Sequence, residues 1–229
     1  MIEAVLQAFS LLFSFDSELS QIILLTLYVS GSAVALAALL GIPAGTWLGL
    51  QAAVKVRWLQ RIIYTLMGLP PVVGGLFVYM LLSRRGILGP LELLFTPTAM
   101  IIAQLLLTLP IIMGLTSVAV RAKGKEVVDT LLSLGAEQRL ILWTIIKESR
   151  YGIFGAIIAG FGRAVAEVGA VIMVGGNIEG QTRVMTTAIV LEVRKGEFAL
   201  AMALGIILLI ISFAINAGLY SLQAGGRDD

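Results

Sequence analysis

Two opposite charges, Arg163 and Glu167, lie four residues apart in an otherwise apolar stretch. On a helix this spacing places both side chains on one face, so the guanidinium and the carboxylate can pair. A charge near the centre of a bilayer costs roughly 2.5–3.5 kcal/mol on insertion scales, and such charges usually mark pathways or partners. The pair predicts either a salt bridge that locks a helix bundle or a gate beside a pathway, where Arg163 would attract an anion and Glu167 would prevent its permanent capture.

A second polar group follows in the turn-rich "GGNIEG" and in the short apolar run after it. That run, residues 184–191, is too short to cross a membrane and predicts a re-entrant or outer-leaflet helix. Its hydroxyls and one cation could meet an anion that enters from outside, although an ordinary external loop with a short packed helix explains the same residues. The candidate pathway residues here are Asn177, Thr182, Arg183, Thr186 and Thr187.

The residue types exclude most enzyme chemistry. The chain has no Cys and no His, so it lacks thiolate nucleophiles, disulfides and imidazole bases or ligands. No carboxylates cluster at metal-ligand spacing, and "RAKGKE" lacks the first glycine and the final Ser or Thr of a phosphate-binding loop. We therefore expect no catalytic residue, no metal site and no cofactor in this chain, and an intramembrane enzyme is disfavoured.

The elements that must position these residues are membrane helices. Hydrophobic residues make up 59% of the chain and charged residues 13%, with a mean hydropathy of +1.00, so the solvent of this protein is lipid. Apolar stretches long enough to cross a bilayer predict an all-α membrane protein with five transmembrane helices in a domain of residues 19–222. The spans are about 19–50, 62–83, 97–120, 151–176 and 198–222. Residues 1–18 lack the features of a cleaved signal and predict an interfacial helix, with a disordered or partly inserted leader as the alternative.

Five crossings place the two termini on opposite sides, and basic residues choose the sides. Ten Lys and Arg residues fall in the loop 55–61, in the loop 121–150 and at the C-terminus, against five on the other side. The positive-inside rule then puts the N-terminus outside and the C-terminus in the cytoplasm.

Small residues recur every fourth position in the first span. In lipid, this spacing lets helix backbones approach closely and pack, although simple Ala and Gly richness is the alternative reading. The residues are Ala33, Ala37, Gly41, Gly45 and Gly49. The second span carries "LPPVVGG", which predicts broken or kinked backbone at membrane depth.

The charged segment 121–150 interrupts the apolar sequence with an amphipathic pattern. Gly135 follows a Leu-rich turn and is a natural helix stop. We expect two short helices with a bend at Gly135 on the cytoplasmic side, and their apolar residues need a partner: the bilayer surface, the spans of this chain or another chain.

This segment resembles the EAA loop of the membrane subunits of ATP-binding-cassette importers. Asp129, Thr130 and Leu131 stand at E-A-A, Gly135 stands at the glycine, followed by Ala136, and Ile145 stands at the isoleucine, while Lys147-Glu148 replaces Leu-Pro. The flanking "LTLPIIMGLTSVAV" and "GRAVAEVGAVIMVGGNIEGQTRVMTTAIVLEVRKGEF" are similar to the molybdate, tungstate and sulfate permease group. Within that group they look more like tungstate permeases.

The resemblance implies a type I importer-like bundle in a prokaryotic plasma membrane, with 121–150 as the coupling loop to a separate ATPase. It also implies a second copy of the chain, an ATPase dimer that holds ATP and Mg, and an extracytoplasmic oxyanion-binding protein. The expected cargo is a tetrahedral oxyanion, tungstate first, with molybdate or sulfate as alternatives. An ion-coupled secondary carrier would need several buried acids, and Glu167 is the only acid inside a span.

Overall fold

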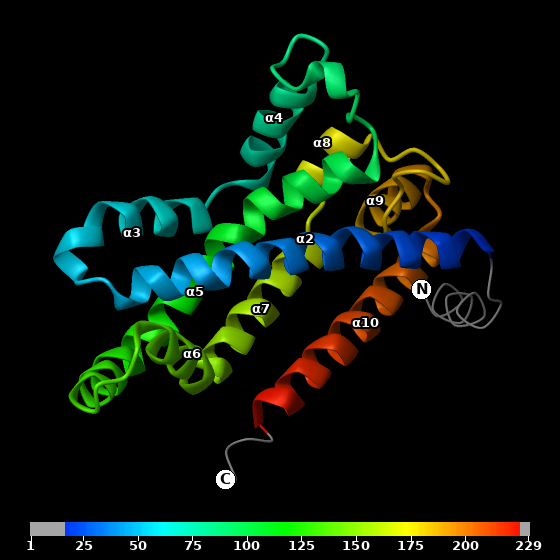
Figure 1. Cartoon of the computed structure of the whole chain (residues 1–229). Coiled ribbons are helices and arrows are strands. Elements are labelled where there is room, and N and C mark those ends of the chain that lie inside the picture. Colours follow the sequence, from blue (N-terminus) through cyan, green and yellow to red (C-terminus); the bar gives the residue numbers. More distant parts are fainter. Residues whose placement is uncertain (1–16, 225–229) are drawn as a thin grey trace. The chain divides into compact units, whose positions relative to one another are not determined.

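The structure is a computed structural model that describes residues 17–224, and every regular element in that range is a helix (Figure 1). The predicted all-α class is therefore confirmed. The predicted interfacial helix in residues 1–18 falls almost wholly outside the described residues. The elements are α2 (Ser17–Leu50), α3 (Ala53–Met67), α4 (Pro71–Leu82), η1 (Gly89–Leu91), α5 (Pro97–Ser133), α6 (Gln138–Glu148), α7 (Arg150–Val165), α8 (Gly169–Gly175), α9 (Met185–Lys195) and α10 (Phe198–Ala224).

Three described stretches are long and apolar enough to cross a membrane on their own: Glu18–Leu50, Pro97–Gly124 and Phe198–Gly218. Two further pairs, α3 with α4 and α7 with α8, qualify if each pair is counted as one broken span. The structure thus carries three to five candidate spans. The predicted five crossings correspond to the larger number, and their boundaries stay a prediction.

Both broken pairs have a local cause. The first gap holds Gly68, Leu69 and Pro70, and Pro71 then opens α4, where its missing N–H costs nothing. The second gap corrects an expectation, because α7 ends at Val165 and does not continue through Glu167. Glu167 lies in the gap instead and supports the start of α8.

The charged segment 121–150 also differs from its prediction. Two short helices were expected, but the first of them is the end of α5, which runs without a break from Pro97 to Ser133 (Figure 1, green). No proline follows Pro110 within this helix, and the polar residues beyond position 120 continue the helical repeat. A single helix therefore joins a candidate span to the turn at Gly135.

The chain divides into two compact units. The described part of the first comprises 17–33, 70–104 and 162–215. Its core joins Ile22 of α2 to Met185 and Ala188 of α9 and to Leu204 and Ile207 of α10.

Within the same unit α4 packs against α8 (Figure 1). The contact is close because Gly75 has no side chain: a Cβ there would lie 2.6 Å from the Cα of Ala170. The "VVGG" of the second predicted span is therefore a packing surface for α8.

The second unit comprises 34–69, 105–161 and the described residues from 216. Here α2 lies against α5 through its small residues. A Cβ on Gly41 would meet Ile112, one on Gly45 would meet Met113 and Thr116, and one on Gly49 would meet Val120 and Ser117. All five residues of the predicted stripe are buried: Ala33, Ala37, Gly41, Gly45 and Gly49.

Candidate functional site

The turn between α5 and α6 is a helix stop built on Gly135. The N–H of Gly135 donates to the carbonyl of Leu132 at 3.0 Å, and the N–H of Ala136 donates to that of Leu131 at 3.0 Å. These two bonds form a Schellman motif, which requires a left-handed residue, and Gly135 has φ of +72°. The glycine predicted from sequence thus ends α5 and redirects the chain into α6.

Beyond this turn, α6 folds back onto α5. Ile141 and Ile145 are buried with Val120, and Leu131 and Ala136 pack against the same cluster. The packing of α6 against α5 therefore uses three of the six predicted coupling residues: Leu131, Ala136 and Ile145. The other three, Asp129, Thr130 and Gly135, are exposed.

The outer surface of the α5–α6 turn is apolar and open. Leu134 is 76% exposed and Trp143 64% exposed, and Leu132, Leu140 and Leu142 are exposed as well. Side chains of this size leave a large apolar area in water unless another surface covers them. We call these five residues the α5–α6 knob. The sequence resemblance did not single them out, although their apolar character was visible.

Arg121 of α5 holds the α2–α3 corner against α5. Its Nη2 donates to the carbonyl of Leu48 at 3.2 Å and to that of Gln51 at 3.5 Å. The amide oxygen of Gln60 accepts from the same guanidinium when the amide is oriented to do so. A cavity of about 360 Å³ beside these contacts is lined by Arg121, Asp129 and the neighbouring backbone of both helices.

The first unit holds the predicted pathway residues, and Glu167 is central among them. Its side chain is buried, and Oε1 accepts from the N–H of Ala170 at 2.9 Å, which satisfies a free donor at the start of α8. Oε2 lies 3.9 Å from Nη2 of Arg163. The charges that were predicted to pair do meet, but across the end of α7, and the carboxylate also caps α8.

The three threonines of the candidate pathway are tied into the fold. The hydroxyl of Thr182 donates to the carbonyl of Gly175 at 2.5 Å, that of Thr186 donates to the carbonyl of Glu167 at 2.9 Å, and that of Thr187 donates to the carbonyl of Val184 at 3.0 Å. Each hydroxyl proton is therefore used inside the chain. In this conformation these residues hold the turn and the start of α9, and they offer no free donor to an anion.

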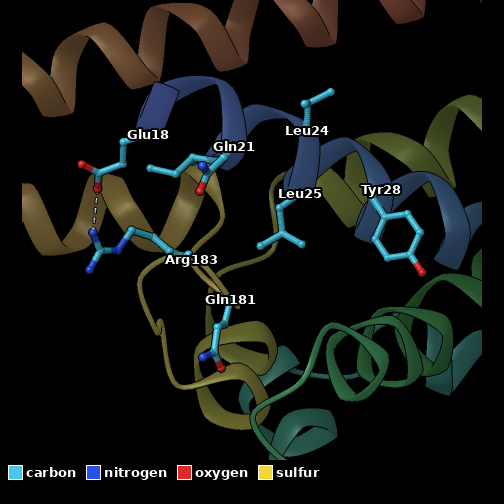
Figure 2. Close-up of a pocket in the computed structure, with 9 residues that line it drawn as sticks. Glu18, Gln21, Leu24, Leu25, Tyr28, Gln181 and Arg183 are labelled. Atoms are coloured by element: carbon cyan, nitrogen blue, oxygen red, sulfur yellow. Dashed lines mark hydrogen bonds and ion pairs between the residues drawn. The ribbon is translucent and has the colours of Figure 1, made fainter. Parts of the chain in front are cut away.

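Arg183 joins that turn to the first residues of α2. Its guanidinium lies 2.9 Å from a carboxylate oxygen of Glu18 and 3.4 Å from one of Glu179, so two acids neutralise it. Figure 2 shows the Glu18 contact at the rim of a cavity of about 370 Å³ that Gln21, Tyr28 and Gln181 also line.

Two buried amides complete this region. Asn177 adopts a left-handed conformation, with φ of 54°, and its Oδ1 is buried without a hydrogen-bond partner among the described residues. Gln104 of α5 was not predicted from the sequence, and its Nε2 donates to the carbonyl of Ala164 at 3.0 Å, in the last turn of α7. Its signal was available, because it is the only amide side chain in residues 97–120.

No group of three acidic side chains in the described range could hold a metal ion. The described residues offer a partly buried ion pair at a helix break and an exposed apolar surface. Glu167 links the end of α7 to the start of α8, and the exposed apolar knob lies where α6 packs against the end of the long helix α5.

Comparison with known proteins finds membrane components of transport systems. A family model described as "Binding-protein-dependent transport system inner membrane component" matches residues 41–224. The tungstate uptake system permease protein TupB of Peptoclostridium acidaminophilum is 46% identical over 216 residues, which cover 94% of this chain and 95% of that protein. TupB of Campylobacter jejuni is 39% identical, covering 92% of this chain and 88% of that protein. The molybdenum transport system permease protein ModB of Mycobacterium tuberculosis is 26% identical, covering 90% of this chain and 80% of that protein.

Proposed function

Because the chain belongs to the family of binding-protein-dependent transport system inner membrane components, we propose that it is the membrane subunit of an ATP-driven tungstate importer. It is a membrane-embedded transport component and not itself an enzyme. A transport system of this kind includes an ATPase and a binding protein. ATP and Mg would be held by the ATPase, and the binding protein would deliver the oxyanion from outside.

The main support for a role in coupling to the ATPase is the α5–α6 knob. Five large apolar side chains stand exposed on the last turn of α5, the turn that follows it and α6, and α5 continues without a break from a candidate span. A groove on the ATPase that covers the knob would remove this apolar surface from water. Movement of that groove would then be transmitted along α5, which would move as a rigid rod. The direct contacts we assign to the ATPase are the knob together with Asp129 and Thr130, both of which are exposed.

Tungstate is favoured over molybdate by similarity, since the two tungstate permeases share much more sequence with this chain than the molybdenum permease does. Molybdate or sulfate import is the second candidate function. In either case two copies of the chain would flank one pathway, because the described part of one copy carries only three to five candidate spans. Arg163, Glu167 and Asn177 would lie near that pathway, with Glu167 holding the α7–α8 break in shape.

The orientation follows from the basic residues: the knob faces the cytoplasm and the N-terminal end faces outside. An ion-coupled carrier is a weaker alternative. Glu167, its best candidate for a coupling acid, is already engaged by the N–H of Ala170 and by Arg163.

The test is co-purification of the ATPase with Gly135 variants. Nothing lies within 4 Å of a Cβ placed on Gly135, so a substitution acts through its φ of +72° and not through a clash. Asn tolerates this conformation whereas Val does not. After gentle solubilisation, the parent and Gly135→Asn should retain an equimolar ATPase, and Gly135→Val should lose it while remaining in the membrane. Equal retention by Gly135→Val would contradict the coupling role of the turn.

A further inference from the structure

The loop between α4 and α5 carries two neighbouring cations, Arg84 and Arg85. Both side chains are exposed, and no carboxylate in the described part of the chain lies within ion-pairing distance of either. They differ in this from Arg183, which two acids neutralise. They also lie on the side of the predicted topology that has fewer basic residues, where the positive-inside rule gives them no role.

This loop is held in one shape by its backbone. The N–H of Gly86 donates to the carbonyl of Ser83 at 2.7 Å, and the N–H of Leu88 donates to that of Leu81 at 3.0 Å. A Cβ on Gly89 would lie 2.5 Å from the carbonyl oxygen of Ser83, so the chain turns back closely on itself. The two arginines are therefore carried on a fixed frame.

The arginines line a cavity of about 600 Å³ whose walls are mainly apolar. Tyr79 and Leu82 of α4 form one wall, and Leu94 and Phe95, just before α5, form another. Glu92 is the one acid at the cavity, so two cations face a single negative charge. The local excess of positive charge suits an anion that has an apolar part.

The surroundings of the cavity suit the surface of a bilayer. Ile87 is 85% exposed, and Leu91 and Phe95 are also exposed, which would be unfavourable in water. The candidate span Pro97–Gly124 begins two residues after Phe95, so this loop lies at a membrane boundary. Apolar side chains can enter the interface there while arginines remain at the depth of the lipid headgroups.

We propose that this cavity binds an anionic phospholipid, with the phosphate held by Arg84 and Arg85 and one acyl chain lying against the apolar walls at the side chains that Tyr79 and Phe95 expose. Guanidinium groups bind phosphate oxygens through paired charge-assisted hydrogen bonds. The apolar wall separates this ligand from a free oxyanion such as the transported substrate, which has nothing to place against it. The inference is independent of the substrate and of the coupling role.

The experiment uses the full-length chain purified with its ATPase and native mass spectrometry. Dioleoyl-phosphatidylglycerol is compared with dioleoyl-phosphatidylcholine, which has the same chains and no net charge. The parent should bind the anionic lipid in preference to the neutral one. Arg84→Gln with Arg85→Gln should weaken that binding by about 30-fold, at roughly 1 kcal/mol for each basic residue. Arg84→Lys with Arg85→Lys should retain most of it.

The matched control is Lys55→Gln with Arg57→Gln, which removes the same charge from two exposed residues of α3 and should leave the lipid preference unchanged. Three results would overturn the proposal. They are equal binding of the two lipids by the parent, binding of phosphatidylglycerol by the double glutamine variant at the level of the parent, and displacement of the lipid by millimolar tungstate or inorganic phosphate. The last result would identify a site for a free oxyanion instead. Because the first comparison uses only the parent, the test holds even if a variant fails to fold.

Discussion

At the scale of single residues, Glu167 is tied to three segments at once. One carboxylate oxygen accepts from Ala170 at the start of α8, the other faces Arg163 of α7, and the carbonyl accepts from Thr186 of α9. A buried acceptor that serves a helix start stabilises the fold, and removal of that acceptor leaves an N–H without a partner. The charge of Glu167 and the oxygen that accepts from Ala170 therefore contribute separately to the stability of the fold, and substitutions can distinguish them.

Two variants separate them. Glu167→Gln keeps an oxygen that can accept from Ala170 and should remain close to the parent in stability. Glu167→Ala removes the oxygen and should lower the free energy of unfolding by about 1–2 kcal/mol. Thermal unfolding in detergent, followed by size-exclusion chromatography, measures both. If Glu167→Gln were as damaging as Glu167→Ala, the ion pair with Arg163 and not the cap would be the main contribution.

At the scale of the elements, the close approach of α2 to α5 depends on the absence of side chains. The carbonyl oxygen of Met113 and the Cβ of Thr116 fill the space that a side chain on Gly45 would need. Gly31, in the same helix, has nothing within 4 Å of its Cβ position. These two glycines give a matched pair, because one substitution meets a neighbouring helix and the other does not.

Gly45→Ala should cost about 1–3 kcal/mol of stability, since the added methyl group forces the two helices apart. Gly31→Ala should be neutral or stabilising by up to about 1 kcal/mol, because Ala is the better helix former. Yield and melting temperature in the same detergent compare the two. Equal behaviour of both variants would mean that α2 does not rely on close contact at Gly45.

These elements also show which features of the fold could be predicted from the sequence and which could not. Apolar length predicted the helical class, and the stop at Gly135 followed from the residue type, because only a left-handed residue ends a helix in this way. The end of α7 at Val165 was not predictable from periodicity, because the apolar pattern continues through the gap and the break depends on a contact, Glu167 with Ala170. The hydroxyls of Thr182, Thr186 and Thr187 looked available in sequence, yet each is used by a carbonyl that only the folded chain brings near.

At the scale of the whole molecule, the proposed orientation places the α2–α3 loop in the cytoplasm and the turn between α9 and α10 outside. The chain has no cysteine, so single cysteines can be introduced without a background of native thiols. Lys55→Cys and Glu197→Cys both replace exposed side chains. In intact cells a membrane-impermeant thiol reagent should label Glu197→Cys alone, and both should react after permeabilisation. The opposite pattern would reverse the topology and move the knob to the outer side.

The most direct measurement of ATP-driven tungstate import is uptake by proteoliposomes that contain this chain and its ATPase, with the binding protein present outside. We expect accumulation of tungstate that requires ATP, that survives Gly135→Asn and that is lost with Gly135→Val. Preference for molybdate or sulfate would reassign the cargo and leave the mechanism intact. Accumulation that needs an ion gradient and no ATP, and that is unchanged in the Gly135 variants, would contradict import coupled to an ATPase through the Gly135 turn.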